Sequence, residues 1–270
     1  MSFLTSANFR QRILSALVMV PLALLVVHVG GWVFTLAVTA LTAVGLYEWL
    51  RLVDPGASRV VTSFAYAALL VTLLADLGQS PAFGVMFGAV LTLILFFLSA
   101  RDHVDRAGWV ALGLPYMGGS GLALLTLHDM QGGRDLVYYL LLVVWGTDTG
   151  AYIAGRLIGG PKLIPAISPN KTWAGLFGGM ALAAVFGYAA AVVLGAQRPE
   201  IGIGLAIIMA VVAQGGDFFK SYFKRRAGVK DSGSLIPGHG GVLDRIDGLV
   251  FAAVFFVMFQ IALGEQMQWW

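Results

Sequence analysis

Two apolar runs flank a polar segment: IGIGLAIIMAVVAQGGDFF (residues 201–219) precedes it, KSYFKRRAGVKDSGSLIPGHGGVLDRID (220–247) is the segment itself, and GLVFAAVFFVMFQIALG (248–264) follows it. Each run has close to the roughly 20 residues that a helix needs to cross a bilayer. The segment between them is rich in glycine, cations and acids. This pattern predicts two membrane-spanning helices joined by a polar loop outside the hydrocarbon.

The composition extends this prediction to the whole chain. Hydrophobic residues make up 59% and charged residues 11% of the 270 residues, and the mean hydropathy is +0.84. A soluble domain carries about 25% charged residues, so the composition indicates an integral membrane protein. The absence of cysteine excludes disulfides, a thiolate nucleophile and cysteine-ligated metals.

Nine apolar runs predict an all-α polytopic membrane protein with about nine transmembrane helices. The first run is longer than the apolar core of a signal peptide, so we expect an uncleaved helix. Glycines and Pro115 in the fifth run predict a kink or close packing against a neighbour. The nine predicted spans are 13–30, 32–50, 60–77, 82–99, 109–127, 136–157, 172–195, 201–219 and 248–264.

The positive charges test this count of spans. With nine spans, only Arg134 and Arg198 lie on one side of the membrane, and the other fifteen of the 17 Lys and Arg residues lie on the opposite side. The positive-inside rule then places the N-terminus in the cytoplasm and the C-terminus in the periplasm, where Trp269 and Trp270 suit an interfacial anchor. Because membrane topology explains the distribution of the Lys and Arg residues, we expect no nucleic acid partner despite the pI near 9.3.

The polar segment also carries a motif with many fixed positions. Residues 221–247 fit Ser-x-Phe-Lys-Arg-x4-Lys-Asp-x-Gly-x2-Ile-Pro-x-His-Gly-Gly-Val-x-Asp-Arg-Ile-Asp, which resembles the signature of the bacterial phosphatidate cytidylyltransferase (CDP-diacylglycerol synthase) family. SPNKT (168–172) and GTDTGAY (146–152) are similar to the same family. Asn170 departs from it, since a second basic residue is expected there.

The resemblance implies an enzyme of phospholipid biosynthesis that converts CTP and phosphatidate into CDP-diacylglycerol and pyrophosphate. It implies Mg²⁺, optionally with a second cation such as K⁺, and a homodimer in the bacterial inner membrane. Both longer cytoplasmic loops, 158–171 and 220–247, belong to the predicted catalytic region, residues 131–270. Residues 1–130 are expected to form a scaffold with lipid access, and the active site is expected to face the cytoplasm.

Four aspartates are candidate metal ligands. Asp148 lies inside an apolar run, where a carboxylate costs about 2.5–3.5 kcal/mol, and a structural hydrogen bond is the alternative to a ligand. Asp217 shares a helical face with Lys220, so a simple ion pair is its alternative. Asp244 and Asp247 begin the last span, where interaction with the helix dipole is the alternative. We expect Asp217 and Asp244 as primary ligands, followed by Asp148 and Asp247.

Cations and small polar residues complete the candidate site. Besides Asp217 and Asp244, we expect Lys171, Lys224 and Arg225 to act in catalysis, although the last two also suit a juxtamembrane basic cluster. The glycines of the Gly-His-Gly-Gly tetrapeptide could let backbone N–H groups approach phosphates. The remaining predicted substrate-binding residues are Ser168, Thr172, Ser221, Lys230, Asp231, His239, Gly240, Gly241 and Arg245.

Two other functions fit parts of this pattern. A secondary transporter could use Asp148 and Asp217 as coupling residues, but such proteins tend to contain internal repeats and paired broken helices, and we find no convincing repeat here. A related nucleotidyltransferase acting on another lipid phosphate is the nearer alternative.

Overall fold

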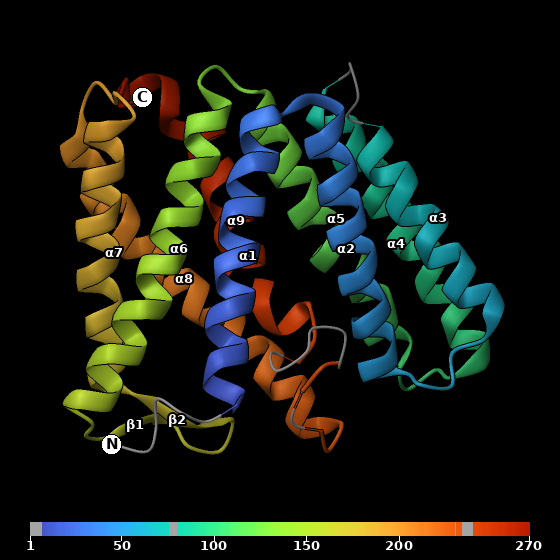
Figure 1. Ribbon diagram of the computed structural model, residues 1–270. Coiled ribbons are helices and arrows are strands. Elements are labelled where there is room, and N and C mark those ends of the chain that lie inside the picture. The colour runs from blue at the N-terminus through green and yellow to red at the C-terminus, as the bar shows by residue number, and fades with distance from the viewer. Residues whose placement is uncertain (1–6, 76–79, 230, 234–239) are drawn as a thin grey trace. The chain divides into compact units, whose positions relative to one another are not determined.

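A computed structural model describes residues 7–75, 80–229, 231–233 and 240–270, with side chains from residue 17 onward except that of residue 265. The described chain is almost entirely helical (Figure 1). The helices are α1 (Ala7–Val29), α2 (Gly31–Val53), α3 (Arg59–Leu74), α4 (Pro81–Asp102), α5 (Ala107–Asp129), α6 (Gly133–Leu157), α7 (Trp173–Val193), α8 (Pro199–Arg226), α9 (Leu243–Phe259) and the short α10 (Glu265–Met267). A π-helical turn, η1 (Gln260–Gly264), joins α9 to α10.

The prediction of a polytopic membrane protein is confirmed. Within the described residues, each of the nine apolar runs forms a helix, and seven of these helices are long and apolar enough to cross a membrane. The other two, α3 and the apolar part of α1 (Leu17–Val29), are shorter. Nine crossings and the side of each terminus therefore remain predictions.

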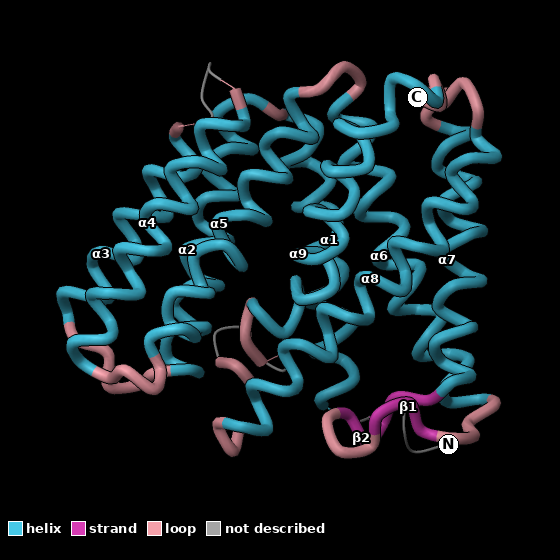
Figure 2. Tube along the Cα trace, turned by 180° about the vertical axis from the view of Figure 1, so that it is seen from behind, coloured by secondary structure: helices cyan, strands magenta, loops and turns pink. Residues whose placement is uncertain are grey.

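One short antiparallel hairpin departs from the predicted all-helical fold. Its strands are β1 (Lys162–Ile164) and β2 (Ser168–Thr172), and Figure 2 shows them leading into α7. Thr172 ends β2 and caps α7, because its hydroxyl accepts a hydrogen bond of 3.0 Å from the backbone N–H of Gly175. The hairpin thus fixes the predicted SPNKT segment at the start of a helix.

The chain divides into two compact units. The first contains residues 1–125 and 227–246, and the second contains residues 126–226 and 247–270. The described part of the loop 227–246, which carries much of the signature motif, therefore packs with the N-terminal helices rather than with α6, α7 and α8.

In the first unit, α5 is the most buried apolar helix. It continues through Pro115, and its glycines allow the predicted close packing: a Cβ at Gly113 would collide with the indole of Trp49. The Trp49 Nε1–H also donates a hydrogen bond of 2.9 Å to the carbonyl of Trp109. Close contact between α2 and α5 fixes the position of α2, the helix that carries Glu48.

The end of α2 is joined to the α4–α5 connection by a buried carboxylate. Asp54 lies 3.0 Å from Nη1 of Arg106 and 2.9 Å from Nδ1 of His103, and its side chain is 1% exposed. Burial raises the pKa of Asp54, but the hydrogen bonds and charges of these two partners outweigh burial, so the pKa lies below its ordinary value.

In the second unit, α6 packs closely along α7, and α7 along α8. A Cβ at Gly150 would collide with the backbone carbonyl of Gly178, so these two glycines let α6 and α7 touch through their backbones. One of the two C-terminal tryptophans departs from expectation: Trp269 is fully buried and packs against Tyr139 and Phe256, whereas Trp270 is partly exposed and its interfacial position stays a prediction. Trp269 is therefore a core residue rather than an interfacial anchor.

Candidate functional site

A cluster of charged side chains surrounds Asp217 on α8. The Asp217 Oδ2 lies 2.5 Å from Nζ of Lys171, and the Oδ1 lies 3.7 Å from Nζ of Lys220. The same Lys220 ammonium pairs with the carboxylate of Asp247 on α9. We call these four residues the Asp217 cluster; two lysines and two carboxylates alternate in it.

Local sequence explains how the cluster assembles. Asp217 and Lys220 are three residues apart on α8 and therefore share a face. A Cβ at Gly216 would collide with the backbone carbonyl of Asp247 and crowd the ring of Phe251, so this glycine lets α9 approach α8 closely. The expected close approach is thus found at Gly216, whereas Gly215 has open space beside it.

A cavity of about 220 Å³ lies beside the cluster. Asp217, Lys171 and Thr172 line it together with Asp148, so two of the four predicted metal ligands face one cavity. Gln214 lines the same cavity; its side chain is buried, and its Nε2 has no hydrogen-bond partner among the described residues. The cavity therefore combines two acids, a cation and an unsatisfied donor, which suits a phosphate-bearing ligand.

The described carboxylates include two that could serve a Mg²⁺ ion. Among the described residues there is no group of three or more acids or histidines placed to hold a metal. Mg²⁺, however, usually takes only one or two carboxylates, with water and substrate phosphates completing its shell. Asp217 and Asp148 on one cavity wall fit that pattern. Asp247 is 9% exposed and paired with Lys220, which suits a structural role as well.

A second cluster forms in the first unit around the signature segment. The Asp244 Oδ2 accepts hydrogen bonds from the backbone N–H (2.9 Å) and hydroxyl (3.0 Å) of Ser232 and from the backbone N–H of Gly241 (3.1 Å). These bonds hold the described loop against the start of α9. They explain an aspartate at this position without a metal, so the role of Asp244 as a ligand stays a prediction.

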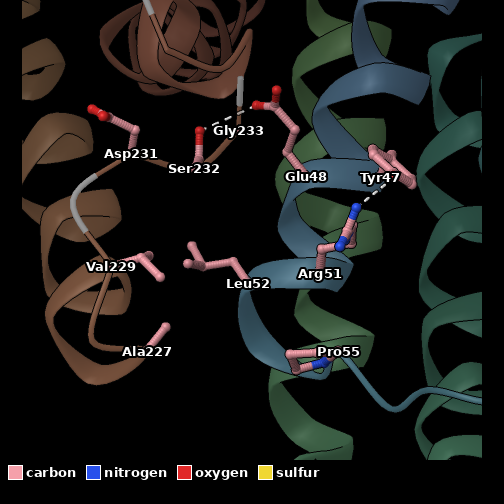
Figure 3. Close-up of a pocket in the computed structure, with 10 residues that line it drawn as sticks. All are labelled: Tyr47, Glu48, Arg51, Leu52, Pro55, Ala227, Val229, Asp231, Ser232 and Gly233. Carbon is pink, nitrogen blue, oxygen red and sulfur yellow. Dashed lines mark hydrogen bonds between the residues drawn. The ribbon is translucent and has the colours of Figure 1, made fainter. Parts of the chain in front are cut away.

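Glu48 on α2 holds the same loop. Its carboxylate accepts hydrogen bonds from the backbone N–H groups of Val242 (3.0 Å) and Leu243 (2.8 Å). Its Oε2 also lies 3.1 Å from the hydroxyl of Ser232, whose single proton it shares with Asp244. Figure 3 shows the last of these contacts at the upper end of a pocket of about 410 Å³. We call Glu48, Ser232 and residues 241–243 the Glu48 network.

Two of the predicted cations, Lys224 and Arg225, lie at the end of α8. Arg225 donates a hydrogen bond of 3.3 Å from Nε to the carbonyl of Ile167, which joins α8 to the hairpin that carries Ser168. Lys224 and Ser221 are partly exposed on the same helix, and Arg245 is exposed on α9. These positions leave the cations accessible to an anionic ligand.

The other predicted loop residues have different surroundings. Asp231 lines the 410 Å³ pocket with Arg51 and Tyr47 of α2, whose side chains are hydrogen-bonded to each other (Figure 3). Gly240 has φ +79°, a conformation that favours glycine. Lys230 and His239 lie outside the described residues.

Sequence reasoning missed Glu48 and Gln214. Glu48 is a lone acid in the apolar run 32–50, and the argument that singled out Asp148 applies to it equally. Gln214 precedes the Gly-Gly-Asp tripeptide in an apolar run, which is a weaker signal because amides are common structural residues. Both lie where the structure concentrates polar groups.

Comparison with known proteins identifies relatives over nearly the whole chain. A model described as "Cytidylyltransferase family" matches residues 10–262. The chain is 40% identical to the phosphatidate cytidylyltransferase of Brucella suis biovar 1 (strain 1330) over 264 residues, covering 96% of each chain. It is 35% identical to that of Pseudomonas aeruginosa over 94% of this chain and 98% of the relative, and 34% identical to that of Bacillus subtilis over 95% and 98%.

Proposed function

The chain belongs to the cytidylyltransferase family, and we propose that the Asp217 cluster and its cavity bind the nucleotide phosphates. Its reaction is that of a phosphatidate cytidylyltransferase: CTP and phosphatidate give CDP-diacylglycerol and pyrophosphate. It is therefore a multi-pass membrane nucleotidyltransferase of phospholipid biosynthesis. The observation that carries this function is the similarity to such enzymes over nearly the whole chain.

The chemistry asks the protein to bring two anions together. A phosphate oxygen of phosphatidate forms a bond to the α-phosphorus of CTP, and the bond from that phosphorus to the bridging oxygen of pyrophosphate breaks. A phosphomonoester is already ionised near neutral pH, so no strong general base is required. Charge neutralisation and alignment are the main contributions of the enzyme.

The two lysines of the cluster suit different tasks. The Lys171 side chain is 22% exposed and lines the cavity, so it can bind a phosphate oxygen. The Lys220 side chain is 4% exposed and contacts two carboxylates, so it orients Asp217 and Asp247. Lys224, Arg225 and Lys230 are proposed to bind phosphate as well, on the resemblance of the signature motif.

The metal is a proposal supported by the donor set. Asp217 and Asp148 would hold Mg²⁺ in the cavity, with Asp244 and Asp247 retained as candidate ligands on the resemblance. When bound, the ion would neutralise charge on the phosphate oxygens. A second cation such as K⁺, the homodimer and a cytoplasmic active site in the inner membrane are proposed on the same resemblance and on the charge sorting.

The experiment follows the label of CTP with purified protein in mixed micelles that contain phosphatidate and Mg²⁺. With label at the α-phosphate, radioactivity is expected in the lipid product; with label at the γ-phosphate, it is expected in pyrophosphate. Other lipid phosphates, ATP and GTP serve as competing substrates. Turnover with another lipid phosphate but not with phosphatidate would favour the related nucleotidyltransferase instead. A folded protein that is inactive with every combination of nucleotide and lipid phosphate would favour the secondary transporter.

A further inference from the structure

Glu48 is an acid buried in an apolar helix. It lies on α2, in a run expected to cross the membrane, and it is 1% exposed. A carboxylate in such a place is costly unless hydrogen bonds replace its hydration. The hydrogen-bond donors around Glu48 therefore indicate its role in the protein.

Among the described residues, the hydrogen-bond donors to Glu48 come from the signature segment. They are the backbone N–H groups of Val242 and Leu243 and the hydroxyl of Ser232, at 2.8–3.1 Å. A carboxylate is an acceptor with two oxygens and no proton to donate, so it matches three converging donors. Figure 3 shows the Glu48 side chain extending from α2 toward Ser232.

The backbone of the segment passes directly against this carboxylate. A Cβ at Gly233 or at Gly241 would collide with the Glu48 oxygens. Sequence alone suggested that Gly241 makes room for a substrate phosphate. In the structure the space beside it is taken by Glu48, so the glycine serves contact within the protein.

The network continues to Asp244. The Ser232 hydroxyl lies 3.1 Å from a Glu48 oxygen and 3.0 Å from Oδ2 of Asp244, and the Gly241 N–H donates to that same Oδ2. The carboxylates of Glu48 and Asp244 therefore both hold Ser232 and the backbone at residues 241–243. We infer that Glu48 is a positioning residue that holds Ser232 and residues 241–243 in place and, through them, positions Asp244 for substrate binding.

This role rests on the proposed function, because the signature segment is taken to bind substrate. The test compares Glu48→Gln, which keeps the size but replaces one acceptor oxygen by a donor, with Ser232→Ala. Thr42→Val is the matched control: Thr42 is also buried on α2, but its hydroxyl bonds to Val38 inside the helix. Two quantities are measured in each purified protein: hydrogen–deuterium exchange of the peptide spanning residues 240–244, and the KM for CTP.

In Glu48→Gln we expect the amides of residues 242 and 243 to exchange about tenfold faster and the KM for CTP to rise about tenfold, as for the loss of about 1.4 kcal/mol of binding. Ser232→Ala should shift both in the same direction but less, and Thr42→Val should shift neither. A purely structural role would lower the amount of active enzyme, hence kcat, at constant KM.

Unchanged exchange in Glu48→Gln would overturn the inference, and so would faster exchange with an unchanged KM. If Glu48→Gln does not yield folded protein, Ser232→Ala carries the same decision by the same two measurements. If the wild type fails to turn over CTP with phosphatidate, the proposed function fails, while the exchange data still decide whether Glu48 holds the segment.

Discussion

Asp217 is contacted by two lysines that differ in burial, and we expect the more buried one to contribute mainly to stability and the more exposed one mainly to activity. The Lys220 side chain is 4% exposed and that of its partner Asp247 is 12% exposed. Lys220→Met keeps most of the side-chain volume but leaves these carboxylates without their buried cation. Removing one partner of a buried pair typically costs about 3–5 kcal/mol of unfolding free energy.

Lys171→Met should behave differently. The Lys171 side chain is 22% exposed, and Asp217 keeps Lys220 when Lys171 is lost. A partly exposed pair contributes about 1 kcal/mol or less. Since about 1 kcal/mol moves Tm by roughly 2–4 °C in a chain of this size class, we expect Tm to fall by roughly 6–20 °C for Lys220→Met and by at most about 4 °C for Lys171→Met.

The assay records thermal unfolding of detergent-purified variants by tryptophan fluorescence, together with activity below both melting temperatures. Lys171→Met is expected to lose roughly 10- to 100-fold in kcat/KM, the effect of one charge-assisted contact to phosphate. Asp247→Leu added to Lys220→Met should recover part of the lost Tm, because one buried carboxylate is then gone. This division of roles would be refuted if Lys220→Met melted within about 2 °C of wild type, or if the Tm of Lys171→Met fell as far as that of Lys220→Met.

Three further predictions concern other positions. Gln214→Leu should lower kcat/KM for CTP by about tenfold without lowering Tm, because it removes an unpaired buried donor; unchanged kinetics would exclude Gln214 from binding. Gly150→Ala should lower Tm by several degrees, since overpacking costs about 1–3 kcal/mol. The control Gly204→Ala should not lower Tm, because the space beside Gly204 is open. Equal Tm values for the two variants would contradict tight packing of α6 against α7. Asp54→Asn should lower Tm at pH 7, and the difference in Tm from wild type should shrink below about pH 4. Folding lowers the pKa of Asp54, so the stability that its ionised form contributes is lost as the pH falls through that pKa. A difference in Tm that is independent of pH would contradict the ion pair.

Local pattern was sufficient to predict the helices. A run of about 20 apolar residues has few alternatives in a membrane, so each predicted span overlaps one α-helix, although α8 continues to Arg226, well beyond the predicted end at residue 219. Asp217 and Lys220 pair as their i, i+3 spacing suggests. The hairpin 162–172 was not predicted, because its strands are too short to produce a periodic pattern.

The contacts between distant segments could not be predicted in the same way. Lys171 reaches Asp217 only because α7 packs beside α8, and Glu48 reaches residues 232–243 only because the signature loop folds back onto α2. Nothing in the spacing of the sequence encodes these distances. What the sequence did contain was the isolated charge of Glu48 in an apolar run, and that signal was not used.

The most direct test of the reaction centre is the rate of CDP-diacylglycerol formation by Asp217→Asn at saturating CTP, phosphatidate and Mg²⁺, with the melting curve of the same sample. If Asp217 lies at the reaction centre, the rate should fall by roughly 100- to 1,000-fold while the protein remains folded. A folded variant with a rate within about tenfold of wild type would contradict that placement and move the search for the reaction centre to the signature segment.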